Sequence, residues 1–206
     1  MNKLTLTGSA VMLGALLALG GSLDASPASV GDPAPDFHLQ DVNRKTQSLS
    51  EFKGKFVVLE WVNPECPFVR KHYDSGNMQR LQQAAAAQGV VWLSINSSGP
   101  GKQGHLTPEI GQEFLIARHA APTALLLDSD GTVGHLYGAK TTPSMFVIDP
   151  KGTLIYAGAI DSVPSTDPDD VSKAVNYVQL ALGEAMAGKP VTTSVTQSYG
   201  CSVKYQ

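Results

Sequence analysis

The chain has 206 residues, of which 42% are hydrophobic and 16% charged, and its 15 basic and 18 acidic side chains give a formal net charge of −3. This composition is typical of a globular protein with room for one ordinary domain. It contains neither a basic excess nor a stripe of Lys and Arg, so we expect no nucleic-acid partner and no electrostatic attraction to membranes.

Residues 1–28 have the pattern of a secretory signal peptide. An apolar run over residues 10–19 follows a lysine, and the small residues Ser26 and Ala28 precede the expected cleavage, with a second solution at Ala25. The apolar run has about half of the roughly 20 residues that span a bilayer, so no stable membrane span is expected after cleavage. The prediction is an exported protein, periplasmic or extracellular.

Apolar stretches predict the strands of one sheet. Residues 56–62 and 90–96 are nearly continuous apolar, β-branched runs, which are typical of strands covered on both faces. A small hairpin is expected before them, and a further strand at 124–128. Residues 144–158 predict two strands joined by a turn.

Helical patterns alternate with these strands. One helix is predicted from residue 67 to about 88, and Thr107 as N-cap before Pro108 predicts the start of another. Apolar residues at helical spacing predict a closing helix over 171–187. The expected product is a mixed sheet with helices on its faces, formed by residues 29–189, followed by an extended arm over 190–206.

Cys66 is the leading candidate for chemistry. It follows a predicted buried strand and precedes Pro67, which suits the first position of a helix because it has no N–H to leave unpaired. At a helix N-terminus the unpaired N–H groups and the helix dipole stabilise a thiolate, and Arg70, Lys71 and His72 add positive charge. The alternative is a small buried cysteine without reactivity.

Pro143 is the second landmark. The stretch TTPSMFVID places it at the opening of a strand, where a proline leaves no ladder N–H unpaired and its peptide bond could be cis. A proline loop that faces a helix-terminal cysteine presents backbone groups to an incoming thiol or peroxide.

From Val30 onward, the chain resembles the redoxin or peroxiredoxin-like (AhpC/TSA-type) branch of the thioredoxin-fold superfamily. The resemblance rests on VGDPAPDFHLQD, SLSEFKGKFVVLEW, NPECPFVRKHY, TTPSMFVIDPKG, YAGAID and GCSVKY. It implies a thioredoxin-like α/β fold: a central mixed sheet with helices on both faces, an N-terminal β-hairpin and an extended C-terminal arm. It also implies a reactive Cys66 beside a cis Pro143, with the Thr142 backbone facing a bound partner, and antioxidant or thiol–disulfide oxidoreductase activity.

Two departures from the family pattern qualify the expected activity. The thioredoxin redox pair has a second cysteine three residues after the first, where this chain has Val69. Typical peroxiredoxins have Thr or Ser three residues before the reactive cysteine and Pro four residues earlier, where this chain has Asn63 and Leu59. Asn63 is either a polar group near the thiol or a turn former before Pro64.

Cys201 is the only other cysteine in the sequence. On a C-terminal arm it could resolve a sulfenic acid or mixed disulfide at Cys66, in the same chain or from another subunit. The alternatives are a structural Cys66–Cys201 disulfide or no contact at all.

The predicted function is an exported thiol-dependent oxidoreductase or antioxidant protein, with Cys66 and Cys201 as catalytic residues and Asn63, Pro67, Thr142 and Pro143 as substrate-binding residues. Its expected partners are a peroxide or disulfide substrate and a thiol reductant, either a protein or a small thiol. We expect no metal and no other cofactor. The alternative is a non-enzymatic thioredoxin-fold binding module with a structural disulfide.

Overall fold

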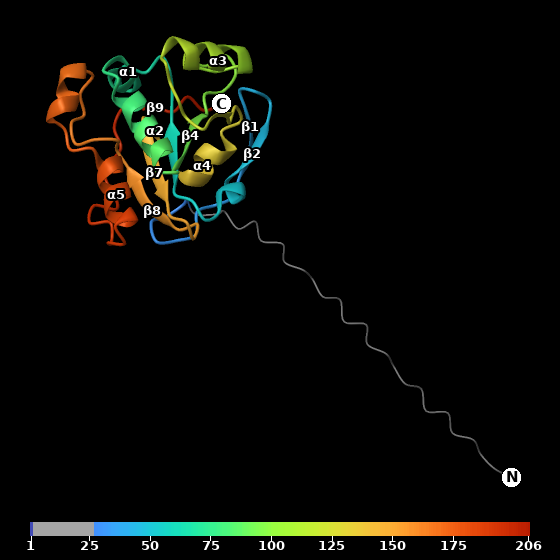
Figure 1. The fold of residues 1–206 in the computed structure, drawn as a ribbon. Helices are drawn as coiled ribbons and strands as arrows, with labels where there is room; N and C mark the ends of the chain where they lie inside the picture. Colours follow the sequence, from blue (N-terminus) through green and yellow to red (C-terminus); the bar gives the residue numbers. More distant parts are fainter. Residues whose placement is uncertain (2–26) are drawn as a thin grey trace.

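The computed structural model describes Met1 and residues 27–206 (Figure 1). The predicted signal peptide falls almost entirely on residues 2–26, which lie outside the described residues. Within the described part of the chain, no helix is both long and apolar enough to cross a membrane.

A seven-stranded mixed sheet forms the centre of the molecule, with the strand order β2-β1-β5-β4-β3-β7-β8. The three central strands β3, β4 and β5 are parallel to one another, and the outer strands pair antiparallel. The N-terminal hairpin and the hairpin over 144–158 are present as predicted. The strands are β1 (His38–Asp41), β2 (Thr46–Ser48), β3 (Val57–Trp61), β4 (Val91–Asn96), β5 (Ala124–Leu127), β7 (Ser144–Ile148) and β8 (Leu154–Gly158).

Helices cover both faces of this sheet, as the resemblance implied (Figure 1). Four of them, α1, α2, α3 and α5, bury side chains in the core on one face, and α4 packs on the other. The α-helices are α1 (Pro67–Asp74), α2 (Asn77–Ala87), α3 (Pro108–Ala117), α4 (Thr132–Tyr137) and α5 (Tyr177–Met186), and the two 3₁₀ helices are η1 (Leu49–Phe52) and η2 (Pro168–Lys173).

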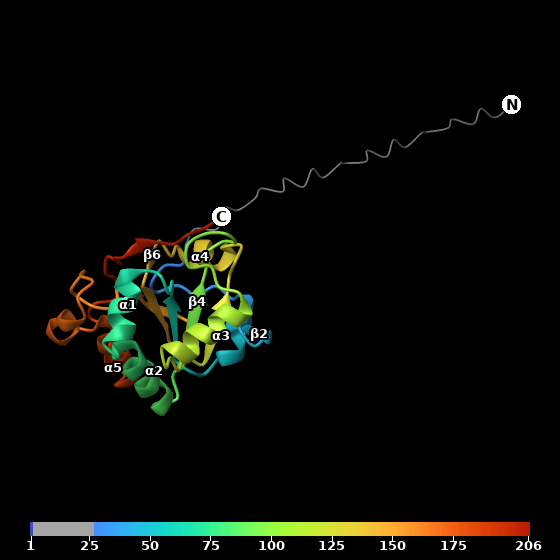
Figure 2. The same cartoon turned by 90° about the horizontal axis from the view of Figure 1, so that it is seen from above.

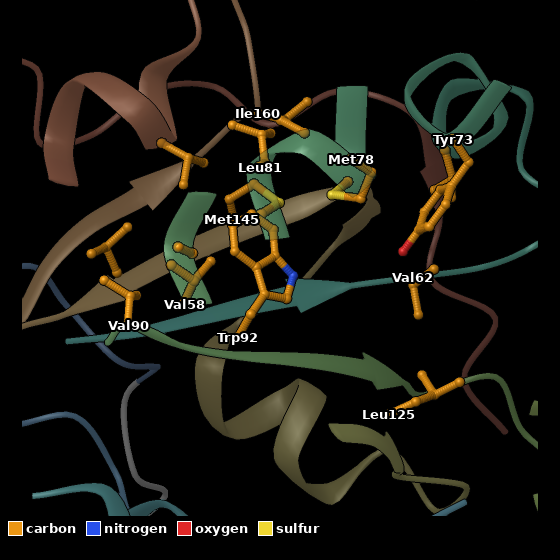
Figure 3. Packing of buried hydrophobic residues seen from close by; sticks show 14 of the residues in the cluster. Val58, Val62, Tyr73, Met78, Leu81, Val90, Trp92, Leu125, Met145 and Ile160 are labelled. Atoms are coloured by element: carbon orange, nitrogen blue, oxygen red, sulfur yellow. The ribbon is translucent and has the colours of Figure 1, made fainter. Parts of the chain in front are cut away.

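The strand β3 lies in the middle of the sheet and is buried along its whole length. Because successive side chains point to opposite faces, Val58 enters one core and Leu59 and Trp61 enter the other. Figure 3 shows the first of these cores, where the indole of Trp92 on β4 is directed toward Met145 and Leu81. Each fully buried large apolar side chain stabilises the fold by about 1.5–3 kcal/mol.

Glu60 is the polar exception in the middle of β3, with 0% of its surface exposed. Burial raises the pKa of its carboxyl, and hydrogen bonds from Trp92, Ser94 and Tyr73, at 2.8, 2.8 and 2.9 Å, act in the opposite direction. These bonds satisfy the carboxyl and tie β3 to β4 and α1.

Two helix predictions were wrong in their boundaries. The predicted helix from 67 to 88 is divided into α1 and α2 because Gly76, with a φ of +70°, takes the left-handed conformation between them. The closing helix begins at Tyr177 rather than at 171, because the Asn176 side chain caps it by accepting from Gln179 N at 2.9 Å.

The C-terminal arm is extended as predicted, and it is bound to the body of the molecule. Its residues Cys201–Ser202 form the strand β9, which pairs antiparallel with β6 (Thr141–Thr142) as a separate two-stranded sheet. Figure 2 shows this segment in red, lying along β6 beyond one end of the main sheet.

Candidate active site around Cys66

The register of the central strands brings two distant segments together. The strands β3 and β7 are antiparallel, and Trp61 at the end of β3 lies opposite Ser144 at the start of β7. The turn that leaves β3 toward Cys66 therefore lies beside Thr142 and Pro143, which lead into β7. This is the arrangement that the sequence predicted for Cys66 and the proline loop.

Cys66 occupies the N-cap position of α1, and Pro67 is the first helical residue, as predicted. The Cys66 side chain has no exposed surface, and its Sγ donates a hydrogen bond to the carbonyl oxygen of Thr142 at 3.0 Å. Pro67 itself is exposed, at the rim of the site. The thiol thus lies at the positive end of a helix dipole, in contact with the loop before Pro143.

The peptide bond between Thr142 and Pro143 is cis, as the resemblance implied. Thr142 is 2% exposed, and its hydroxyl is buried without a hydrogen-bond partner. This hydroxyl is therefore available as a donor to a thiolate at Cys66.

Cys201 lies directly beside this pair, because β9 places it opposite Thr142 in the β6–β9 ladder. The residue before it must be glycine: Gly200 has a φ of +122°, and a Cβ there would collide with the carbonyl group of Thr142. Both cysteines are free thiols. Four predicted site residues, Cys66, Cys201, Thr142 and Pro143, thus come together at one place.

The surroundings of Cys66 favour its thiolate. Burial raises the pKa of the Cys66 thiol, but nearby groups that can donate to a thiolate outweigh it: the Thr142 side chain, the side chain and main chain of Cys201, and the main chain of Val69. The pKa of Cys66 is therefore lower than that of an ordinary cysteine, which favours the nucleophilic thiolate form.

Cys201 has the opposite character. Burial and the neighbouring Cys66 thiol, through its hydrogen-bonding capacity and its charge when ionised, raise the pKa of Cys201 to about 11, and Lys204 lowers it only in part. At neutral pH Cys201 is therefore a thiol. The surroundings thus shift the pKa values of the two cysteines in opposite directions.

Asn63 supports the loop rather than facing the thiol with a free amide. Its Oδ1 accepts from Glu65 N at 2.9 Å, and its Nδ2 donates to Gln103 O at 3.2 Å. The first bond shapes the turn between β3 and α1, and the second ties this turn to the loop at Gln103. They correspond to the turn-forming alternative for this residue.

The positive charge predicted from Lys71 and His72 is not available to the thiol. Lys71 is buried and lies 3.3 Å from the Asp161 carboxylate. Burial lowers the pKa of His72 to about 4, although Asp161 acts to raise it, so the imidazole is neutral at pH 7. Of the three basic residues in the first turns, only Arg70 is exposed.

Sequence reasoning missed two residues next to the site. Asp161, in the segment after β8 (Leu154–Gly158), accepts a hydrogen bond from the hydroxyl of Tyr199, two positions before Cys201. Asp161 belongs to the YAGAID segment that carried the family resemblance, but its spacing to Tyr199 follows no local period. The contact became apparent only in the folded chain.

A strand, a helix that begins with a thiol, and a cis-proline strand beside it define a protein of the thioredoxin fold. The chain aligns with the thioredoxin domain of a thiol-disulfide oxidoreductase from Bacteroides vulgatus with a TM-score of 0.51 and 18% identity, covering 70% of this chain and 96% of that one. The pattern of the AhpC/TSA family matches residues 30–157, and the chain belongs to this family.

Two further proteins are similar over most of their length. Thiol-disulfide oxidoreductase ResA of Geobacillus thermodenitrificans (strain NG80-2) is 26% identical over 150 residues, which are 70% of this chain and 80% of that protein. The crystal structure of a hypothetical protein from Sinorhizobium meliloti 1021 aligns with a TM-score of 0.73 and 26% identity, covering 88% of this chain and 97% of that one.

Proposed function

We propose that this protein is a thiol–disulfide oxidoreductase in which Cys66 is the nucleophile and Cys201 the resolving thiol. The observation that carries the proposal is the place of Cys201 beside Cys66, opposite Thr142 in the β6–β9 ladder. The name of the ResA relative, a thiol-disulfide oxidoreductase, supports the same class of reaction.

The reaction balances as two thiol–disulfide exchanges. The Cys66 thiolate attacks a substrate disulfide, forms a mixed disulfide and expels one substrate thiolate, which takes up a proton. Cys201 then loses its proton, attacks the Cys66 sulfur and expels the second substrate thiol, which leaves a Cys66–Cys201 disulfide. An external dithiol reductant, of protein or small-molecule type, restores both thiols.

The first step prepares the second. The charge on Cys66 is one of the causes that hold the pKa of Cys201 high. When Cys66 enters a mixed disulfide, this charge and the hydrogen bond to the thiolate are lost. The pKa of Cys201 then falls toward its ordinary value, and the residue becomes a better nucleophile when it is needed.

A disulfide is favoured over a peroxide as the substrate. The Thr or Ser and the Pro that typical peroxiredoxins place before the cysteine are replaced here by Asn63 and Leu59. The Asn63 amide already bonds Glu65 N and the carbonyl oxygen of Gln103, and Leu59 is fully buried. Neither side chain is placed to bind a peroxide.

Export forms part of the same proposal. The secretory pattern of residues 1–28 supports it, and a compartment outside the cytoplasm offers disulfide-bonded substrates. Cell fractionation and the N-terminal mass of the mature protein test it. A chain that retains residues 1–28 and stays in the cytoplasm contradicts it.

The activity test uses a disulfide-bonded peptide, a dithiol reductant and the variants Cys66→Ser and Cys201→Ser. We expect Cys66→Ser to abolish peptide reduction and Cys201→Ser to accumulate a mixed disulfide at Cys66, detected by mass spectrometry after acid quench. If Cys66→Ser lowers only the thermal stability and the unaltered protein reduces no disulfide, the structural-disulfide alternative is correct. If the protein consumes hydrogen peroxide and does not reduce the peptide, its substrate is a peroxide and not a disulfide.

A further inference from the structure

Lys71 and Asp161 form a buried ion pair beside the C-terminal arm, and this pair is not part of the two-thiol site. Lys71 Nζ is 3.3 Å from Asp161 Oδ2 and donates to the carbonyl oxygen of Val163 at 2.7 Å. The Lys71 and Asp161 side chains are 0% and 2% exposed. Buried ion pairs of this kind often add no net stability over apolar residues of similar volume, so stability alone does not account for the pair.

Tyr199 connects this pair to the arm. Its hydroxyl donates to Asp161 Oδ1, and its ring packs edge-on against Phe68 with centroids 5.8 Å apart. Lys71 Nζ lies 5.8 Å from the centre of the same ring. Hydrogen bonds to a charged acceptor are among the stronger ones in proteins, so Tyr199 is firmly held.

Gly200 and Cys201 connect the anchored Tyr199 to the two-thiol site. Gly200 passes against the Thr142 carbonyl, where no side chain fits, and Cys201 then pairs with Thr142. Only one residue separates Tyr199 from Cys201. Fixing the tyrosine therefore fixes the register of β9 on β6.

We propose that Tyr199, held by the buried Lys71–Asp161 pair, is a positioning residue that keeps Cys201 beside Cys66. Asp161 orients the tyrosine hydroxyl, and Lys71 neutralises the carboxylate. The inference rests on the proposed function, because it assigns Tyr199 to the step in which Cys201 attacks Cys66.

The two exchange steps respond to this anchor in opposite directions. Cys66 has no exposed surface, and Gly200 and Cys201 of the arm lie against Thr142, whose carbonyl Cys66 contacts, so we expect an external disulfide to reach Cys66 when the arm lifts from the site. A weaker anchor therefore makes the first attack faster. Resolution requires the arm to return with a substrate group attached to Cys66, so a weaker anchor makes the second attack slower.

Mixing the reduced protein with 5,5′-dithiobis(2-nitrobenzoate) separates these steps. Cys66 attacks the reagent and expels one thionitrobenzoate, at a rate that scales with reagent concentration. Cys201 then gives up its proton, attacks the mixed disulfide and expels the second thionitrobenzoate, at a rate independent of reagent. For Tyr199→Phe we expect a faster first step and a second step slower by about tenfold, because one hydrogen bond to a charged group is lost.

Tyr137→Phe is the matched control. Its hydroxyl donates to the carbonyl oxygen of Pro35 at 2.6 Å, and its ring lies in the core on the other face of the sheet. This variant loses one buried hydroxyl without touching the arm, so both rates should equal those of the unaltered protein. Gly200→Ala, which forces β9 away from Thr142, should change the rates in the same directions as Tyr199→Phe and replaces it if that variant does not fold.

Two results overturn the inference. If Tyr199→Phe leaves both rates unchanged and only lowers the stability as Tyr137→Phe does, Tyr199 is a structural residue, while the proposed function stands. If the unaltered protein releases a single thionitrobenzoate and Cys201 stays free, resolution by Cys201 does not occur, and the proposed function fails together with the inference.

Discussion

At the scale of single residues, Thr142 serves both thiols through different atoms. Its carbonyl oxygen accepts from Cys66 Sγ, its main chain pairs with Cys201, and its buried hydroxyl has no hydrogen-bond partner. The contact with Cys66 Sγ and the pairing with Cys201 are made by the backbone of Thr142, so a change of its side chain leaves them in place. The hydroxyl is therefore the part of Thr142 that a substitution can test alone.

Thr142→Val should raise the pKa of Cys66. The hydroxyl is one of the groups that lower this pKa, and valine has nearly the same shape without a donor. The variant removes a donor to the thiolate and takes nothing from the protonated thiol, so the ionised form loses stability relative to the protonated form. The rate of iodoacetamide labelling at Cys66 as a function of pH measures the shift.

Thr141→Val is the control for this prediction, since the Thr141 hydroxyl is also buried without a partner but is not among the groups that shift Cys66. Its labelling profile should coincide with that of the unaltered protein. A Thr142→Val profile that also coincides would show that the hydroxyl does not stabilise the thiolate.

The sequence could point to Cys66, Pro67 and Pro143 because each belongs to a local pattern, a helix start or a strand opening, and the family resemblance added Thr142. Tyr199 and Asp161 could not be found in this way. They are 38 positions apart, and their contact depends on how the arm returns to the body of the molecule. Only the register of β9 on β6 brings them together.

At the scale of elements, residues 67–88 form two helices, α1 and α2, in place of the single predicted one. The polar and apolar pattern from 67 to 88 is compatible with one helix, and the sequence indicated a single one. Gly76 ends this continuity, since its left-handed backbone forms the N-cap of α2. A glycine within a helical pattern can lie inside one continuous helix or separate two helices, and local periodicity does not distinguish these cases.

Exchanging two glycines for alanine should have opposite effects on stability. Gly76→Ala forces a side chain into a φ of +70° and brings its Cβ to 2.9 Å from Arg80 Nη1, so we expect a loss of about 1–2 kcal/mol in the free energy of unfolding. Gly183 lies in α5 with nothing within 4 Å of an added Cβ, so Gly183→Ala should gain about 0.5–1 kcal/mol.

Chemical denaturation of both variants measures these differences. A stabilising Gly76→Ala would mean that α1 and α2 can form one helix, as the sequence pattern indicated. Gly183→Ala also tests α5 itself, because a gain requires that residue 183 is helical.

At the scale of the whole molecule, the arm is held on both sides of Cys201. Tyr199 binds Asp161 on one side, and on the other Tyr205 donates to the carbonyl oxygen of Ala139 at 2.6 Å and stacks on His135 at 4.0 Å. The composition of the arm predicted an extended segment, and the spacing of its tyrosines did not show that it is tied back. Its attachment makes Cys201 part of the packed protein.

The same buried cluster should make the stability of the protein depend on pH. Lys71, Asp161 and Tyr199 surround His72, whose imidazole is buried, and burial lowers its pKa from 6.5 to about 4. Between these values the unfolded chain binds more protons than the folded one, so the free energy of unfolding falls as the pH drops from 6.5 to about 4. A shift of this size corresponds to about 3 kcal/mol.

Denaturation at pH 7 and at pH 4, compared between the unaltered protein and His72→Gln, isolates this contribution, because every other titrating group is common to both. The unaltered protein should lose about 3 kcal/mol more than His72→Gln over this range. His119→Asn, which removes an exposed histidine from a left-handed position that asparagine tolerates, should keep the full loss. Equal losses in the unaltered protein and in His72→Gln would mean that His72 is protonated as readily in the folded chain as in the unfolded one, and that the Lys71–Asp161 cluster is open to water.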